Sequence, residues 1–151
     1  MSSKIINKRI NREIPNLSKK YGPLNIISLP DDTYNIIQLT NYNIDVKINS
    51  NYPFQPPDMF INNKSYLTVI IDYPKYVYEK LNEKGITCLC CESILCKNRW
   101  NPSIKIINIV DEYFNNRKLI CDIIKKKFIE VICIKNNINC LLLINKIQGF
   151  I

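Results

Sequence analysis

The spacing of apolar residues near the N-terminus predicts a helix. Apolar side chains recur there at the three- and four-residue intervals of one helix face: Ile6, Ile10, Ile14 and Leu17. Pro15 has no backbone N–H to donate, so we expect this helix to end or bend near Ile14. Residues 21–23, Tyr-Gly-Pro, predict a firm break after it.

After this break the spacing shortens to the alternation that is typical of strands. Residues 42–48 alternate strictly between apolar and polar, which predicts a strand with one buried face. Shorter apolar runs predict three further strands, at 25–29, 34–39 and 59–61. Turn residues at 30–32 separate the first two strands, and Asn41 marks a tight hairpin before 42–48. These elements predict an antiparallel meander.

Helical spacing returns in the second half of the chain. A short helical turn is expected at 77–81, and Pro102 suits the first turn of a longer helix. We assign the buried face of this longer helix to four apolar residues: Ile104, Ile107, Val110 and Phe114. The Asn pair at 115–116 interrupts the pattern before a second helical stretch, 120–132, and another Asn pair precedes a final apolar segment, 138–147. The order of elements predicts an α+β fold in a single domain, 1–151.

Composition narrows the class of protein. A chain of 151 residues with 46% hydrophobic and 23% charged residues can bury a core. The sequence shows neither the ~20-residue apolar run of a membrane span nor a signal peptide, so we expect a cytoplasmic or nuclear protein without a membrane partner. The net charge of +8 is spread over a chain rich in Ile, Asn and Lys, which suggests codon bias in an AT-rich virus or protist. We therefore expect no specific nucleic-acid partner.

Cysteine and histidine counts limit the chemistry. The chain has seven cysteines, an odd number, and no histidine. Reduced thiols are therefore expected, and imidazole-assisted nucleophiles and His-containing zinc sites are excluded. Cys121, Cys133 and Cys140 fall in apolar helical patterns, where we expect them in the core.

The remaining four cysteines lie close together in sequence, at 88, 90, 91 and 96. Three uses stay open on spacing alone. Cys88 is a candidate nucleophile, and Cys88-x-x-Cys91 is a candidate redox pair. Together, Cys88, Cys90, Cys91 and Cys96 are a candidate Cys₄ zinc site, although a second C-x₂-C pair is missing.

The surroundings of Cys88 carry a family resemblance. A Tyr-Pro-Phe-x-Pro-Pro corner, residues 52–57, follows the third predicted strand. A Gly-x-x-Cys-Leu segment follows at 85–89, and a Trp-x-Pro corner at 100–102. The first helix has a basic start, 8–14. In this order, the motifs resemble the ubiquitin-conjugating enzyme family over about residues 8–115, with 116–151 as a helical extension.

This resemblance implies a fold and a reaction. The fold has an N-terminal helix, an antiparallel meander sheet and C-terminal helices. Cys88 would accept ubiquitin or a ubiquitin-like modifier from an activating enzyme as a thioester, and pass it to a substrate lysine with a ligase bound. The reaction needs no cofactor.

The resemblance also assigns roles by position. The basic face of the first helix, Lys8, Arg9 and Arg12, would meet the activating enzyme. Two loops would contact the ligase through Phe54 and through Asn101, Pro102 and Ser103. Five further motif residues would have a structural role: Tyr52, Pro53, Pro56, Pro57 and Trp100.

The chain departs from this family at its oxyanion support. The family places His-Pro-Asn before the cysteine, and this sequence has no such tripeptide; its nearest echo is Tyr73-Pro74-Lys75. Asn82 is a candidate replacement for the missing amide. Losing one oxyanion donor typically costs ~10²–10³ in rate. An inactive variant that binds ubiquitin or a ligase is therefore the alternative hypothesis, and a small zinc-binding module is a third.

Overall fold

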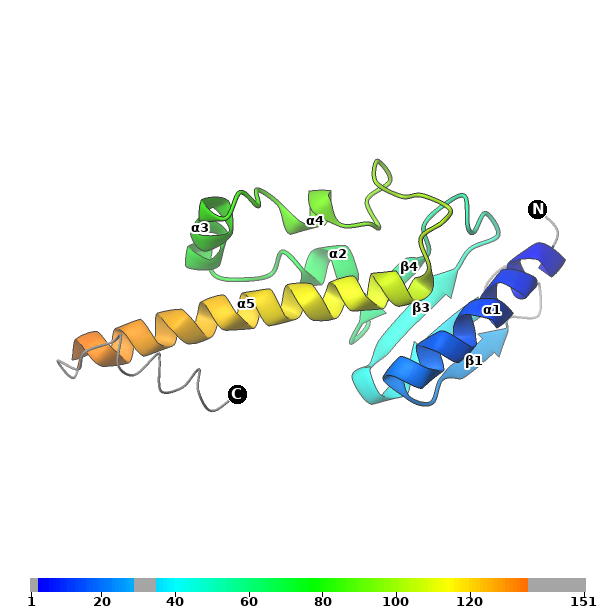
Figure 1. Ribbon diagram of the computed structural model, residues 1–151, viewed down its shortest axis with the longest axis horizontal. Helices are drawn as coiled ribbons and strands as arrows, with labels where there is room; N and C mark the ends of the chain where they lie inside the picture. Colours follow the sequence, from blue (N-terminus) through cyan, green and yellow to red (C-terminus); the bar gives the residue numbers. More distant parts are fainter. Residues whose placement is uncertain (1–2, 29–34, 136–151) are drawn as a thin grey trace. The chain divides into compact units, whose positions relative to one another are not determined.

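The computed structural model describes residues 3–28 and 35–135 (Figure 1). The chain divides into two units, which are described separately below. The first unit comprises Met1–Asp72 and Cys88–Phe114, and the second comprises Tyr73–Thr87 and Asn115–Ile151. The α+β class is confirmed, with an N-terminal helix, a five-stranded antiparallel sheet and helices after it.

In the first unit, helix α1 (Ser3–Tyr21) continues through Pro15. The helix was predicted to end or bend near Ile14, and the predicted end is wrong, because the helix continues to Tyr21. Pro15 lies on the exposed side of the helix, so the carbonyl that loses its partner can bond to water instead. The helix ends at Gly22, whose φ of 87° suits glycine and whose N–H donates to the Ser18 carbonyl at 2.9 Å.

The buried face of α1 differs at one position from the predicted face. Ile6, Ile10 and Leu17 are buried as expected. Ile14 is only half-buried, and Glu13 takes its place with 6% of its surface exposed. A buried carboxylate on an otherwise apolar helix face needs partners.

The sheet of the first unit is the predicted meander. Its order is β1-β2-β3-β4-β5, with every neighbouring pair antiparallel. The strands are β1 (Asn25–Ser28), β2 (Asn35–Leu39), β3 (Ile44–Ile48), β4 (Asp58–Ile61) and β5 (Lys64–Ser65). One face is buried through alternate residues: Ile37, Leu39, Ile44, Val46, Ile48, Met59 and Ile61. The predicted turn at 30–32 lies outside the described residues.

Asparagine residues form the sharp turns of this sheet. The hairpin predicted at Asn41 is confirmed, because β2 and β3 pair antiparallel on either side of it; their connection is a 3₁₀ turn, η1 (Thr40–Tyr42), which ends at Asn43 with φ 51°. Asn62 and Asn63, with φ 48° and 63°, join β4 to β5. All three asparagines occupy the left-handed region, where a short polar side chain is tolerated. The sequence pattern missed β5 and the short helix α2 (Tyr66–Val69) that follows it.

Helix α5 (Ile106–Lys135) is one helix of 30 residues, where two were predicted. The Asn pair at 115–116 lies within it, because asparagine weakens a helix interior by only about 0.5 kcal/mol. Pro102 lies in a turn before the helix and not in its first turn, so that prediction is also wrong. The part of α5 in the first unit buries Ile106, Ile109, Val110 and Tyr113, a face shifted from the predicted one. The predicted break at 136–137 and the segment 138–147 lie outside the described residues.

The second unit contains α3 (Lys75–Glu83) and the rest of α5. The helical turn expected at 77–81 is confirmed and is longer, with Val77 and Leu81 buried. Cys133 is buried as predicted, but Cys121 is exposed, because it lies off the face that buries Ile123 and Cys133. Cys140 lies outside the described residues.

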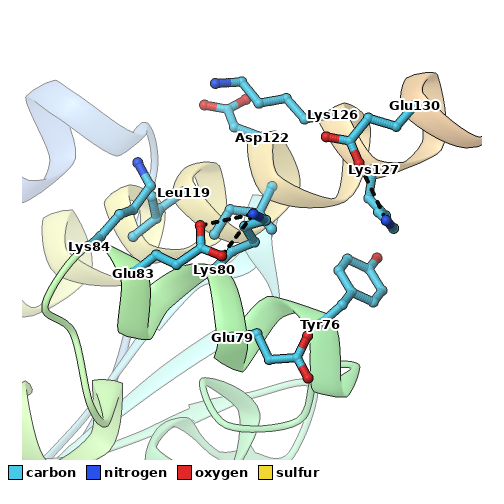
Figure 2. Close-up of a pocket in the computed structure, with 11 residues that line it drawn as sticks. Tyr76, Glu79, Lys80, Glu83, Lys84, Leu119, Asp122, Lys126, Lys127 and Glu130 are labelled. Atoms are coloured by element: carbon cyan, nitrogen blue, oxygen red, sulfur yellow. Dashed lines mark hydrogen bonds and ion pairs between the residues drawn. The ribbon is translucent and has the colours of Figure 1, made fainter.

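A pocket of about 640 Å³ lies in the second unit (Figure 2). Its charged lining combines four lysines and four carboxylates: Lys80, Lys84, Lys126, Lys127, Glu79, Glu83, Asp122 and Glu130. Some of these charges already pair, as Lys80 does with Glu83 at 2.8 Å and Lys127 with Glu130 at 3.3 Å. The balanced charges give the pocket no strong preference for a cation or an anion. Among the described helices, none combines the length and the apolar character of a bilayer span.

Candidate functional site

Cys88 lies where an extended chain enters a short helix of the first unit. Its backbone is extended, with φ −157° and ψ 114°, and α4 (Leu89–Glu92) begins at the next residue. The Glu92 N–H closes the turn on the Cys88 carbonyl at 3.1 Å. Leu89 turns inward and is only 4% exposed. No helix was predicted here from the sequence, so α4 is a finding of the structure.

Three sulfur atoms gather at this turn. The Cys88 Sγ lies 2.8 Å from the Cys90 Sγ, which in turn lies 3.9 Å from the Cys91 Sγ. All three sulfurs lie within 4.8 Å of one another. Cys88 and Cys90 are half-buried and Cys91 is exposed. Leu89 is buried, whereas none of these three thiols is; the three are here called the three-thiol cluster.

Hydrogen bonds within the cluster give its three thiols different pKa values. The Cys88 and Cys90 sulfurs share a hydrogen bond, in which Cys90 is the donor whenever Cys88 is the thiolate, and the Cys91 amide and thiol add further donors. These bonds favour the thiolate and lower the pKa of Cys88 to about 7. Since Cys90 is held as the donor, its pKa rises to about 12, and the pKa of Cys91 is also raised, chiefly through Cys88. Of the three thiols, Cys88 is therefore the one whose pKa most favours the thiolate, which is the nucleophilic form.

Glu112 of α5 holds the segment that follows α4. Its carboxylate accepts a hydrogen bond from the Ser93 hydroxyl at 2.6 Å and one from the Ile94 N–H at 2.8 Å. The Tyr66 hydroxyl donates to the same carboxylate at 2.8 Å. Ser93 is 1% exposed, so these bonds are shielded from water. The sequence gave no signal for Glu112, since its partners come from distant parts of the chain.

The two proline corners predicted to flank Cys88 meet in the structure. The Trp100 indole N–H donates to the Pro53 carbonyl at 2.7 Å. The Trp100 and Tyr52 rings pack with centroids 6.2 Å apart, and Tyr52 is fully buried. Pro57 is buried as well, and Pro56 is half-buried. The structural roles expected for these motif residues are consistent with this packing.

Glu13 joins the corner to both long helices of the first unit. Its carboxylate accepts hydrogen bonds from the Tyr52 hydroxyl at 3.0 Å and from the Ile106 N–H at 2.7 Å, and it pairs with Arg9. The bond to Ile106 satisfies a free N–H at the start of α5. Burial first, and then the charge of Glu13, raises the pKa of Tyr52, so this hydroxyl stays a donor. The helical spacing of Glu13 with Ile10 and Leu17 was a signal for its burial that the sequence prediction did not use.

The residues predicted to contact an activating enzyme have different surroundings. Lys8 and Arg12 are exposed on α1. Arg9 is half-buried and is engaged within the unit, because it pairs with Glu13 and donates to the Ile104 carbonyl at 3.1 Å. Lys8 and Arg12 thus carry exposed positive charge on this helix, while Arg9 connects α1 to the chain before α5.

The residues predicted to contact a ligase lie on the surface of the first unit. Phe54 is 64% exposed, although its neighbours in the corner are buried. Asn101, Pro102 and Ser103 are exposed, and the Asn101 side chain accepts the Ser103 N–H at 2.9 Å, which fixes their turn.

Asn82 lies on α3 in the second unit, where its side chain is exposed. Tyr73-Pro74-Lys75 belongs to the same unit. The role of Asn82 as a substitute oxyanion donor stays a prediction.

Comparisons with protein-family models, with curated proteins and with solved structures found no match for this chain. The case for a function therefore depends on the site itself.

Proposed function

We propose that this protein is a divergent thiol acyl carrier of the ubiquitin-conjugating type, with Cys88 as the acceptor of the modifier. The observation that carries the proposal is the placement of Cys88. It is a partly exposed thiol at the start of α4, in the unit where the Tyr52–Pro53 and Trp100 corners pack on each other. Glu112 fixes the chain directly after α4, through Ser93 and Ile94.

The chemistry needs only sulfur at the reacting centre. The Cys88 thiolate attacks the carbonyl carbon of a modifier held as a thioester on an activating enzyme, and the activating enzyme's thiolate leaves. In the second step a substrate amine attacks the new thioester, an N–C bond forms, and the Cys88 thiolate leaves. No metal or organic cofactor takes part in either exchange.

A loading reaction tests this proposal. The purified protein is mixed with an activating enzyme, ATP and ubiquitin, and each ubiquitin-like modifier is tried in turn. We expect an adduct that reductant removes. Cys88→Ala should abolish it, and Cys88→Ser should convert it to an ester that resists reductant. Cys121→Ala is the matched control, because Cys121 is exposed and distant in sequence from the cluster, and it should load like the wild type.

Two results would contradict the proposal. One is an adduct that persists in Cys88→Ala, and the other is the failure of every modifier to load. The second result would favour the alternative, an inactive variant that binds a ligase or ubiquitin. The exposed Phe54 beside a rigid corner is the observation that favours this alternative. It predicts that Phe54→Ala weakens ligase binding by about 10-fold or more, as measured by calorimetry, without unfolding the protein.

A further inference from the structure

The three-thiol cluster has a geometry that acyl transfer does not require. A single thiol suffices to carry an acyl group, yet Cys90 and Cys91 place two more sulfurs within 4.8 Å of Cys88. From the geometry we infer that Cys88, Cys90 and Cys91 form a three-thiolate site for a soft metal ion such as Zn²⁺, with one coordination position left open.

The distances suit a thiolate-bound metal. With Zn–S bonds of about 2.3 Å, tetrahedral geometry separates two sulfurs by about 3.8 Å. The Cys90 and Cys91 sulfurs are already 3.9 Å apart. The Cys88 and Cys90 sulfurs, at 2.8 Å, must separate by roughly 1 Å, which a small rotation of these half-buried side chains about their Cα–Cβ bonds provides.

The local fold supplies the three ligands from one turn. Cys88 precedes α4 and Cys90 and Cys91 lie within it, so no distant segment has to move to complete the set. The buried Leu89 and the Glu112 bonds to Ser93 and Ile94 hold this turn from behind. Binding therefore orders few additional groups, which reduces its entropic cost.

The number of ligands distinguishes this site from the zinc site considered from the sequence. Among the described residues, the cluster contains three cysteines, and Cys96 is not one of its members. Three protein ligands and an open position are typical of exchangeable or reactive zinc, whereas structural zinc has four. All three thiols lose their protons when the metal binds. Because the metal would then occupy the Cys88 sulfur, the metal and the acyl group compete for it. This competition depends on the proposed function; the metal site itself does not.

Direct metal titration of the full chain tests the site. The protein is reduced with a phosphine, stripped of metal, and titrated with Zn²⁺ against a chromophoric chelator and with Cd²⁺ by ultraviolet absorption. We expect one ion per chain and a thiolate-to-cadmium charge-transfer band of three-thiolate intensity. Cys90→Ser and Cys91→Ser should each lower Zn²⁺ affinity by about 10-fold or more and reduce the band by one third.

Matched variants make the test specific. Cys96→Ser and Cys121→Ser should bind like the wild type, and circular dichroism checks that every variant is folded. The inference is overturned if no stoichiometric binding occurs, or if Cys96→Ser or Cys121→Ser lowers affinity as much as Cys91→Ser does.

A second arm separates this inference from the proposed function. Zn²⁺ added before loading should prevent the modifier adduct, and a chelator should restore it. If the ion binds but no modifier loads under any condition, the metal site stands and the acyl-carrier function fails. If modifiers load but metal does not bind, the function stands and the metal site fails.

Discussion

At the scale of single residues, the hydrogen bonds of a few polar side chains shape the surroundings of Cys88 and hold the first unit together. Among the cysteines that the structure describes, Cys88 differs from the others through the donors around its sulfur, and these donors come from the residues two and three positions later. Glu13 and Glu112 are single carboxylates that each bind groups from distant parts of the first unit. Each of these residues yields a measurable expectation.

The reactivity of Cys88 should depend on pH with a midpoint near its pKa of about 7. Only the thiolate reacts, so alkylation by iodoacetamide should accelerate through about pH 7 and level off above about pH 8, where most of the thiol is ionised. Cys90→Ala removes the principal donor, and the midpoint should rise. Mass spectrometry of the Cys88 peptide between about pH 5 and 9 measures this rate. A wild-type midpoint at or above ~8.5, the value of an ordinary thiol, would contradict the expectation.

Replacing Glu13 should destabilise the first unit. Glu13→Ala leaves the Tyr52 hydroxyl and the Ile106 N–H without their acceptor, and we expect the free energy of unfolding to fall by about 3 kcal/mol. Denaturant unfolding measures the change. Glu83→Ala is the matched control, because Glu83 is 61% exposed, and it should change stability by less than about 0.5 kcal/mol. Equal effects of the two variants would refute a special role for Glu13.

Residue identity alone was enough to propose Cys88 and the flanking corners as a candidate site, because motif order is visible in a linear chain. The role of Cys88 stays a prediction. The sequence did not predict Glu112, because its partners Tyr66, Ser93 and Ile94 are brought to it only by folding. Pattern reasoning identifies chemically distinctive residues more readily than the carboxylates that position them.

At the scale of elements, helices α1 and α5 both pass through residues that the sequence treated as interruptions. Pro15 and the Asn pair at 115–116 disfavour helix locally, but burial of apolar residues on both sides outweighs that cost. The strands were predicted more accurately, because the alternation in β3 corresponds directly to its one buried face. Helix ends depend on tertiary partners, such as Glu13 at the start of α5, and local spacing does not contain them.

Helix α1 should become more stable when its proline is removed. Pro15→Ala restores a backbone N–H within the helix, and we expect unfolding to cost about 1–2 kcal/mol more, after allowing for the greater freedom of the unfolded chain. Thermal and denaturant unfolding check this value. Asn16→Ala, also exposed on α1, is the control and should gain only about 0.5 kcal/mol. Loss of stability in Pro15→Ala would show that the proline serves the native helix.

A single substitution should separate the hydrogen bond between the proline corners from the packing of their aromatic rings. Trp100→Phe keeps an aromatic ring but loses the N–H that donates to the Pro53 carbonyl, so we expect a loss of about 1–2 kcal/mol. Phe54→Ala, at the exposed position of the same corner, should change stability by less than about 0.5 kcal/mol. Urea unfolding of both variants provides the comparison, and a Trp100→Phe protein as stable as the wild type would exclude the hydrogen bond as a stabilising element.

At the scale of the whole molecule, the chain forms two units that the linear pattern did not predict. The first unit ends at Phe114, within helix α5. Its sheet, α1 and the start of α5 contain the candidate site, while α3 and the remainder of α5 form the second unit. The sequence predicted the α+β class because strand and helix periods are clearly different. The division into units depends on long-range contacts, which periodicity does not report.

Acid should weaken the first unit through Asp111. Burial alone would raise the pKa of Asp111, but hydrogen bonds from Lys20 at 2.6 Å and from Tyr21 outweigh it, and the pKa lies below its usual value. A lowered carboxyl pKa contributes stability above the unfolded-state pKa of about 4, and that contribution is lost as pH falls through the folded-state value. The stability difference between wild type and Asp111→Asn should therefore be largest near neutral pH and shrink below about pH 4. A constant difference across urea titrations from about pH 7 to 3 would contradict this linkage.

The three left-handed asparagines connect protein structure to nucleotide composition. Codons for asparagine begin with AA, whereas those for glycine begin with GG, so a genome drifting toward A and T replaces one with the other. The chain has only 3 glycines, and the left-handed positions at 43, 62 and 63 are all asparagine. Because asparagine tolerates this backbone region better than most side-chain-bearing residues, such drift can proceed at these turns with little damage to the sheet. Two of the glycines, Gly22 and Gly85, also have positive φ, so turns in such a chain should be sought at asparagine as well as at glycine.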